Sequence, residues 1–193
     1  MAGRKLEFDR EEVLEKAMDL FWTKGYKATG LKEILEHVGI QRQSLYNTFG
    51  CKHELFLEAI RHYGNTSMRR FEEWLEEPGS PLGNIRNLFR FLAEEAANPQ
   101  YRGCMLANTI MELAPHDPAV AQEVSLLTIR MEKAFERAIE RAVAAKELPT
   151  DTNSRQLARF LYHVVLGFNV RGKANPGRSY IDDILEVALS LLE

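Results

Sequence analysis

The most constraining feature of this chain is the segment from Arg42 to Thr48, a polar helical pattern of barely two turns that follows a glycine at position 39. The stretch before the glycine, Leu31 to His37, has apolar residues at helical spacing and predicts another short helix. A helix this short is marginal alone in water, so tertiary packing must hold it. The chain is therefore expected to present a short polar helix outward from a packed support.

The residues around this glycine separate into apolar and polar positions. Val38, Ile40 and Leu45 would pack the two short helices against a preceding helix, which the sequence predicts to stop at Gly25. The polar side chains that stay free can read hydrogen-bond donors and acceptors in a major groove of DNA; they are Gln41, Arg42, Gln43, Ser44 and Asn47. This layout is that of a helix-turn-helix, with residues 42–48 as the reading helix.

Residues flanking the reading helix are expected to contact DNA phosphates and so set its register. Lys52, at the start of the next helix, adds its charge to the free backbone N–H groups there, and Tyr46 offers a hydroxyl. Lys27 and Thr29 precede the helix at 31–37, where a second phosphate could lie. Phe49 is expected to be buried as the hinge between helices. The alternative for the polar positions is a solvated helix face.

Nearly every other segment also reads as helix, and no period-2 apolar run is long enough for a sheet, so we expect an all-α fold. Helix starts are indicated by Asp9, by Ser80 before a proline, and by Asp117 before a proline. The later helices are expected at roughly 52–75, 81–97, 104–114, 117–146, 153–171 and 179–192.

Composition excludes several classes of protein. No apolar run approaches the ~18 residues of a membrane span, and the N-terminus lacks an apolar signal core, so we expect a cytoplasmic protein without a membrane partner. Cys51 and Cys104 form no metal-binding spacing and no disulfide framework, so no cofactor is expected. The net charge is −3, yet residues 1–52 hold nine Lys and Arg against eight Asp and Glu, which permits a local basic face.

The stretch "GYKATGLKEILEHVGIQRQSLYNTFGCKHELF" resembles the DNA-binding domain of the TetR family of bacterial transcription regulators. The resemblance covers roughly residues 9–60, and its most specific part is the Tyr-x-x-Phe-x-x-Lys ending at Tyr46, Phe49 and Lys52. Two positions depart from the family pattern: Gly30 stands where a Ser or Thr cap is common, and Cys51 where a small polar residue is usual.

The resemblance implies an all-helical homodimer that binds a near-palindromic operator in double-stranded DNA, usually as a repressor released by a small-molecule effector. It implies a three-helix helix-turn-helix domain at residues 1–52 and a helical ligand-binding and dimerisation domain at 53–193. Effector binding would shift the helices on either side of "EEPGSP" (76–81) and so change the separation of the two reading helices.

An effector pocket and a dimer interface can be assigned from the helical faces. The candidate pocket residues are Cys104, Met105, Asn108, Met111, Glu112, His163, Phe168 and Asn169; the alternatives are core packing, a solvated Glu112, and a core or interface position for His163. The last two helices are more apolar than one inward stripe requires, which predicts a four-helix dimer interface through Phe160, Val164, Ile184, Leu185 and Ala188. Ordinary core helices in a monomer are the alternative.

Two other functions compete with a ligand-released regulator. Cys104, after Arg102 and Gly103 at a helix start, could act as a redox or electrophile sensor, or as a nucleophile with His163 or His116 as base, although burial is the commoner fate of a free cysteine. The same N-terminal domain could also serve a chromosome-associated DNA-binding protein without a regulatory role. Loss of DNA binding on addition of a small molecule would discriminate between these readings.

Overall fold

Helix caps determine where several elements of the fold begin, as the sequence predicts. In the computed structural model, which describes residues 8–192, the Asp9 carboxylate accepts the backbone N–H of Glu11 at 2.8 Å. The Ser80 hydroxyl accepts the N–H of Gly83 at 2.8 Å, and the Asp117 carboxylate accepts the N–H groups of residues 119 and 120 at 3.1 Å. Each of these bonds satisfies a backbone donor that the first helical turn leaves without a partner.

The described residues form helices and no strand, which confirms the all-α prediction. The helices are α1 (Arg10–Lys24), α2 (Leu31–Val38), α3 (Arg42–Phe49), α4 (Lys52–Tyr63), a π-helical turn η1 (Gly64–Met68), α5 (Arg69–Glu76), α6 (Pro81–Ala96), α7 (Met105–Glu112), α8 (Pro118–Ala144), α9 (Ser154–Gly172) and α10 (Arg178–Ser190). These bounds differ from the predicted ones by one or two residues at most helix ends, where the last turns fray.

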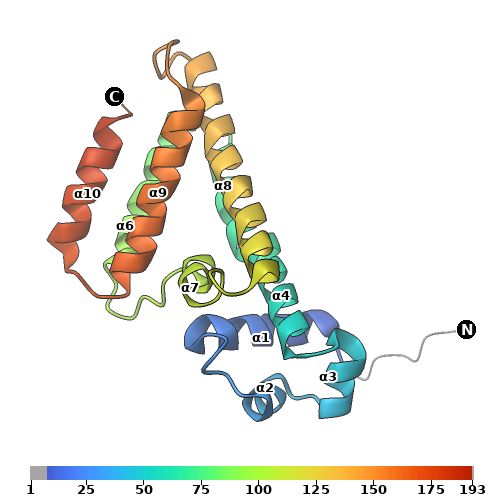
Figure 1. Ribbon diagram of the computed structural model, residues 1–193. Helices are drawn as coiled ribbons and strands as arrows, with labels where there is room; N and C mark the ends of the chain where they lie inside the picture. The colour runs from blue at the N-terminus through green and yellow to red at the C-terminus, as the bar shows by residue number, and fades with distance from the viewer. Residues whose placement is uncertain (1–7, 193) are drawn as a thin grey trace, which may run out of the picture.

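Figure 1 shows a small head below an upright helical body. Helices α1, α2 and α3 form the head, and α4 runs from the head upward into the body. In the body α6 packs against α8 and α9, and α10 packs on α6 and α9. The short helix α7 lies between head and body and contacts α1 and α4 as well as α8 and α9. It is therefore placed to connect the two parts.

Buried side chains hold the two short helices of the head against α1 and α4. Leu45 and Phe49 of α3 and Ile34 of α2 are buried, as are the predicted packing positions Val38 and Ile40. Each fully buried aliphatic or aromatic side chain contributes roughly 1.5–3 kcal/mol relative to an exposed one. This packing supplies the support that a helix of eight residues cannot supply for itself.

The helix predicted at 52–75 is continuous but contains a π-helical turn, Gly64–Met68, between α4 and α5. The backbone of Gly64 lies so close to the Leu127 side chain of α8 that an added Cβ would collide with it. Within this turn Thr66 donates its hydroxyl to the carbonyl oxygen of His62 at 2.8 Å. Such turns often lie near functional sites, because they change the direction in which the following side chains point.

The predicted division of the chain after residue 52 falls at the start of α4. This helix packs against helices of the head and of the body. Phe56 of α4 meets Phe21 of α1 with ring centroids 5.0 Å apart, while further along the same helix Tyr63 is buried under α7. The division into residues 1–52 and 53–193 stays a prediction. No helix in the described part of the chain is both long and apolar enough to cross a membrane.

Candidate nucleic-acid interface and internal cavity

The exposed face of α3 carries the polar residues that the sequence assigns to DNA. Gln41, Arg42, Gln43, Tyr46 and Asn47 are exposed and Ser44 is half-buried. The side chains that anchor the helix project to its opposite side, into the head core. The structure therefore brings these six predicted residues together on one short surface, as a helix that enters a groove requires.

Two side-chain pairs order this face along the helix. The Arg42 guanidinium donates to the Tyr46 hydroxyl at 3.3 Å and lies 5.6 Å from the centre of its ring. One residue further on, the Gln43 amide donates to the Asn47 side-chain oxygen at 2.9 Å. In both pairs the two residues are one helical turn apart, so each bond restricts the rotamers of both side chains before DNA binds. Less side-chain entropy is then lost when these groups contact DNA.

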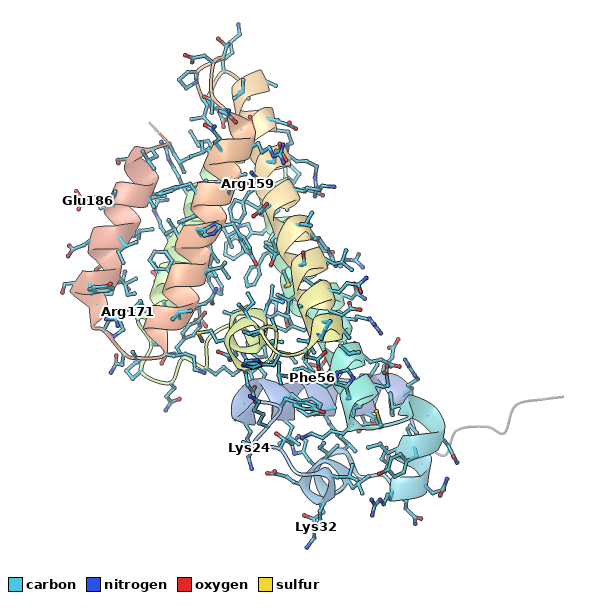
Figure 2. The ribbon with its side chains drawn as sticks, viewed as in Figure 1. Lys24, Lys32, Phe56, Arg159, Arg171 and Glu186 are labelled. Atoms are coloured by element: carbon cyan, nitrogen blue, oxygen red, sulfur yellow. The ribbon has the colours of Figure 1, made fainter. Side chains whose placement is uncertain are left out.

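The flanking residues predicted to contact phosphate differ from one another in exposure. Lys27 is exposed, but Thr29 is fully buried and donates its hydroxyl to the Gly25 carbonyl oxygen at 2.5 Å. The prediction of a phosphate contact through the Thr29 side chain is therefore wrong for this conformation. The exposed Lys32 was not predicted; in Figure 2 it points away from the body at the far end of the head. Its position in the first turn of α2 is the signal that the sequence offered.

Lys52 has its partners inside the head. Its ammonium donates to the Tyr26 carbonyl oxygen at 2.7 Å and lies 4.0 Å from the centre of the Tyr26 ring. Burial lowers the pKa of Lys52, and the negative charge of Glu112 opposes this shift. The ammonium therefore supports the loop between α1 and α2, whereas the prediction gave it to a phosphate.

A cavity of about 750 Å³ lies in the body, between α4–α6 on one side and α8–α9 on the other. Most of its lining is aromatic or apolar, with the rings coming from Trp22, Tyr63, Phe71, Trp74, Phe91, Tyr101, Phe135 and Tyr162. Charged side chains among the lining residues are Arg70, Glu73, Glu77, Glu95 and Arg102. Ligand sites in proteins typically measure roughly 300–1,000 Å³ with mostly apolar walls, so the cavity is of suitable size and character for a small molecule.

Two pairs of polar side chains in the cavity wall are bonded to each other. The Tyr63 hydroxyl lies 3.2 Å from the Cys104 thiol, and the Tyr101 hydroxyl donates to the Asn169 side-chain oxygen. Burial raises the pKa values of Tyr63, Tyr101 and Tyr162, so these phenols are neutral at physiological pH. The interior of the cavity can therefore offer hydroxyl donors and acceptors to a ligand without a phenolate charge.

Most of the predicted pocket residues lie outside this cavity. Cys104 and Asn169 line it, but Met105 and Phe168 are buried in the core, where the Phe168 ring centroid lies 6.4 Å from that of Phe89. The cavity lining includes Gly103 and Cys104 but no residue of α7 itself. The walls come instead from α4–α6, and the density of aromatic residues between 63 and 101 was the sequence signal for them.

The remaining predicted pocket residues face other surroundings. Met111 is 57% exposed, the Asn108 side-chain oxygen accepts from the Lys173 ammonium at 3.1 Å, and His163 is exposed with its Nδ1 2.8 Å from the Arg159 carbonyl oxygen. Met111 and Asn108 are therefore absent from the large cavity and line a smaller pocket of about 290 Å³ between α1 and α7 together with Glu112, whereas His163 lines neither. Cys104 lines the cavity and lies beside Tyr63, whereas His163 is exposed outside the cavity and bonded within α9, so the structure does not bring the two together as nucleophile and base.

Glu112 is the predicted pocket residue with the most different role. Its carboxylate accepts the backbone N–H of Lys27 at 2.7 Å and of Tyr26 at 3.1 Å, so it joins α7 to the loop between α1 and α2. Glu112 is outside the large cavity and lines the smaller pocket beside Gly25, where its carboxylate is bonded to the backbone and is not simply solvated. The two bonds span 86 and 85 residues of sequence, a separation that no local pattern encodes.

The predicted dimer residues on α9 and α10 are only partly on the surface. Phe160 is exposed, and Val164, Ile184 and Leu185 are half-buried. Ala188 is 1% exposed, so it packs inside the protomer and its assignment to the interface is wrong. The exposed apolar residues near it are Val187 and Leu191; the prediction missed Val187, because a shift of one residue along a helix turns the side chain by about 100°.

Two sequence families match the chain. The family described as "Bacterial regulatory proteins, tetR family" matches residues 13–59, and the one described as "Tetracyclin repressor-like, C-terminal domain" matches residues 81–187. The first match covers the head with the first part of α4, and the second runs from α6 into α10.

Similar proteins align over nearly the whole chain. The HTH-type transcriptional regulator YezE of Bacillus subtilis (strain 168) is 35% identical in an alignment 193 positions long that covers 99% of this chain and 100% of that protein. The HTH-type transcriptional repressor ComR of Escherichia coli (strain K12) is 27% identical, with 96% of this chain and 88% of that protein covered. Among solved structures, a cysteine-substituted TetR family regulator, CifR, complexed with 26-base-pair double-strand operator DNA, has a TM-score of 0.84 and 30% identity, covering 97% of this chain and 98% of that one.

The relative reactivity of the two cysteines tests whether Cys104 is buried in the cavity wall. Cys51 is exposed, whereas burial raises the pKa of the Cys104 thiol, partly offset by bonds from Tyr63 and from backbone N–H groups. The thiolate is the reactive form, so iodoacetamide should alkylate Cys51 first, and the rate at Cys104 should rise only at a pH above the ordinary thiol range of about 8.5.

Peptide mass spectrometry of the native protein over time, at several values between about pH 7 and 10, measures both rates. The protein unfolded in urea is the control, in which the two cysteines should react alike. A Cys104 that reacts as fast as Cys51 in the native protein at neutral pH would contradict this picture of the cavity wall.

Proposed function

The chain belongs to the TetR family of bacterial transcriptional regulators, and we propose that it represses transcription as a homodimer on a near-palindromic operator until a small molecule enters its cavity. The observation that carries this proposal is the polar outer face of α3, held on the buried side chains of Leu45 and Phe49. Such a helix has an exposed row of hydrogen-bonding groups at fixed positions, which is what sequence reading in a major groove needs.

Some of the exposed residues of the head are candidates for contacts with bases and others for contacts with phosphates. Gln41, Arg42, Gln43 and Asn47 are the candidates for base edges, because their amide and guanidinium groups match the donor and acceptor patterns of bases. Tyr46, Ser44, Lys27 and Lys32 are the candidates for phosphate contacts, because their hydroxyl and ammonium groups suit phosphate oxygens and their side chains are at least partly exposed. The likeness to operator-bound CifR supports this orientation of the head toward DNA.

Two copies of the chain would join through the outer faces of α9 and α10. Phe160 of α9, Val187 of α10 and Leu191 just after α10 are exposed, and large exposed apolar side chains favour burial against a partner. A two-fold axis through these helices makes the interface self-complementary and presents two copies of α3 to the same side of DNA. In a palindromic operator the two half-sites lie about 34 Å apart, one turn of the double helix.

The effector that fits the cavity is a mostly apolar, ring-containing small molecule with one or two hydrogen-bonding groups. The aromatic walls favour rings and alkyl groups, and the neutral phenols of Tyr63 and Tyr101 provide bonds to a hydroxyl, carbonyl or similar group. Binding would release the operator if the ligand-filled body favours a separation of the heads that no longer fits the two half-sites. We assign the protein no enzymatic role and place it in the cytoplasm, where its DNA partner is.

The decisive experiment is capture of sheared DNA from the host by the purified protein at a defined salt concentration, followed by sequencing. A short palindromic motif is the expected result. Diffuse binding without a motif would instead favour a chromosome-associated protein, and absence of binding at low salt would refute the DNA-binding role. Salt must be fixed because the electrostatic part of DNA binding falls steeply with salt concentration.

Arg42→Ala should weaken binding to the captured operator by about 1–3 kcal/mol for each half-site if Arg42 contacts a base. Arg69→Ala is the matched control, because Arg69 is also an exposed arginine but lies on α5 in the body, paired with Glu73. Fluorescence anisotropy with a labelled operator measures both affinities. Equal affinities for the two variants would remove Arg42 from the interface.

Val187→Glu should weaken dimerisation by about 2 kcal/mol or more, because it buries an unpaired charge in the proposed interface. Val187 is 63% exposed in the protomer, so its replacement should leave the protomer folded. Leu126→Glu on α8, at a residue 55% exposed, is the control and should remain dimeric. Sedimentation velocity over a range of concentrations gives the dissociation constants. A Val187→Glu protein as dimeric as the control would place the interface elsewhere.

The chain has two tryptophans, Trp22 and Trp74, and both line the cavity; Trp22 also borders the smaller pocket beside Glu112, so a shift in tryptophan emission that Leu92→Phe reduces identifies binding in the cavity. Compounds that shift this emission should also weaken operator binding, by roughly 5- to 150-fold for ordinary allosteric coupling. Leu92→Phe, which takes up space in the cavity wall, should reduce both effects together. If every compound that shifts the emission leaves operator affinity unchanged at saturation, ligand binding in the cavity does not control DNA binding.

A further inference from the structure

Helix α7 is attached at its first turn to the wall of the cavity. Cys104 precedes this helix and its thiol lies 3.2 Å from the Tyr63 hydroxyl of α4. The carbonyl oxygen of Gly103 accepts the indole N–H of Trp22, from α1, at 2.9 Å. These four residues all line the cavity, so a ligand there must touch or displace groups that hold the start of α7.

The last residue of α7 is attached to the head. Glu112 holds two successive backbone N–H groups with its two carboxylate oxygens, that of Lys27 at 2.7 Å with Oε1 and that of Tyr26 at 3.1 Å with Oε2. Both amides belong to the loop between α1 and α2, outside the hydrogen-bond pattern of either helix. Bonds from N–H groups to a charged carboxylate are among the stronger hydrogen bonds in proteins, so one side chain of the body positions this loop.

A second charge holds the same loop from the other side. The Lys52 ammonium, at the start of α4, donates to the Tyr26 carbonyl oxygen at 2.7 Å, so Tyr26 is bonded at its N–H by α7 and at its C=O by α4. Gly25 makes the close approach possible: its φ is +83°, and a Cβ there would lie 2.8 Å from Glu112 Oε2. The loop therefore has little freedom while Glu112 is in place.

We propose that α7 transmits occupancy of the cavity to α3 through Glu112, which acts as a positioning residue for the reading helix. This inference rests on the proposed function, since it explains how a ligand would reach the operator-binding face. A helix of eight residues is about 12 Å long and moves as one body, so displacement of its first turn also displaces its last. Because α2 follows the loop directly and α3 follows α2, release of the loop moves the reading helix.

The direction in which operator affinity changes when Glu112 is replaced distinguishes a positioning role from a purely electrostatic effect. Removal of a negative charge from a DNA-binding protein normally tightens its binding to DNA, since phosphates are negative. Glu112→Gln removes one charge and one of the two acceptor oxygens, and we expect it to weaken operator binding by on the order of tenfold. Glu36→Gln is the matched control, because Glu36 is an exposed residue of α2 paired only loosely with Lys32 at 3.8 Å; it should bind as tightly as the wild type or tighter.

A double-mutant cycle tests the transmission itself. Tyr63→Phe removes only the hydroxyl at the cavity end of α7, and we expect it to change operator affinity severalfold in the wild-type background and less than about twofold in the Glu112→Gln background. Residues this far apart normally act independently, so such dependence identifies α7 as the link. Equal effects of Tyr63→Phe in the two backgrounds, zero included, overturn the proposal. Trp22→Phe, which removes the bond to Gly103, replaces Tyr63→Phe if that variant does not fold.

Amide hydrogen exchange in the DNA-free protein gives a readout independent of operator binding. Exchange at the N–H groups of Tyr26 and Lys27, followed by NMR, should accelerate at least about tenfold in Glu112→Gln and stay unchanged in Glu36→Gln. Unchanged exchange in Glu112→Gln overturns the proposal. If the wild-type protein binds no palindromic DNA, the proposed function fails, and the exchange rates still decide whether Glu112 holds the loop.

Discussion

A helix of eight residues cannot hold a polar face outward in water by itself, and the head of this protein is organised around that limit. Leu45 and Phe49 insert into a core formed by α1, α2 and α4, so the free energy that keeps α3 helical comes from burial at its inner side. The outer side is then free to carry residues chosen for hydrogen bonding, which include Arg42 and Gln43. Recognition and stability are thereby assigned to opposite sides of one short helix.

The body serves the opposite purpose, since it encloses space. Its helices pack tightly around rings such as Phe89, Phe135 and Phe168, yet a cavity of about 750 Å³ remains beside them. Empty apolar space costs packing energy, and a protein normally closes it. A cavity that persists beside a tightly packed core, with hydroxyl groups such as that of Tyr63 in its wall, is consistent with a site that a ligand fills.

The junction between head and body depends on charged groups that bind backbone atoms. Glu112 and Lys52 hold Tyr26 from opposite sides, and nearby the Asp117 cap of α8 lies 2.7 Å from the His53 imidazole of α4. Such bonds are strong but directional, so a small displacement weakens them more than it weakens apolar contacts. This makes the junction rigid in one arrangement and easy to release into another, which a switch between two states requires.

The sequence by itself determined the elements whose cause is local. Helix caps at Asp9, Ser80 and Asp117, the apolar spacing of α2 and α3, and the resemblance around Tyr46 all depend on residues within one or two helical turns, so a pattern could reveal them. The exposed face of α3 followed from the same periodicity.

The tertiary structure alone decided which groups meet across the fold. It buried Thr29 and Ala188, removed most of α7 from the cavity, and brought Glu112 to an amide 86 residues earlier in the chain. The physical reason is that helical periodicity defines which side chains share a face. The partner of that face depends on how whole helices pack, and a rotation of one residue, about 100°, is enough to exchange a buried position for an exposed one.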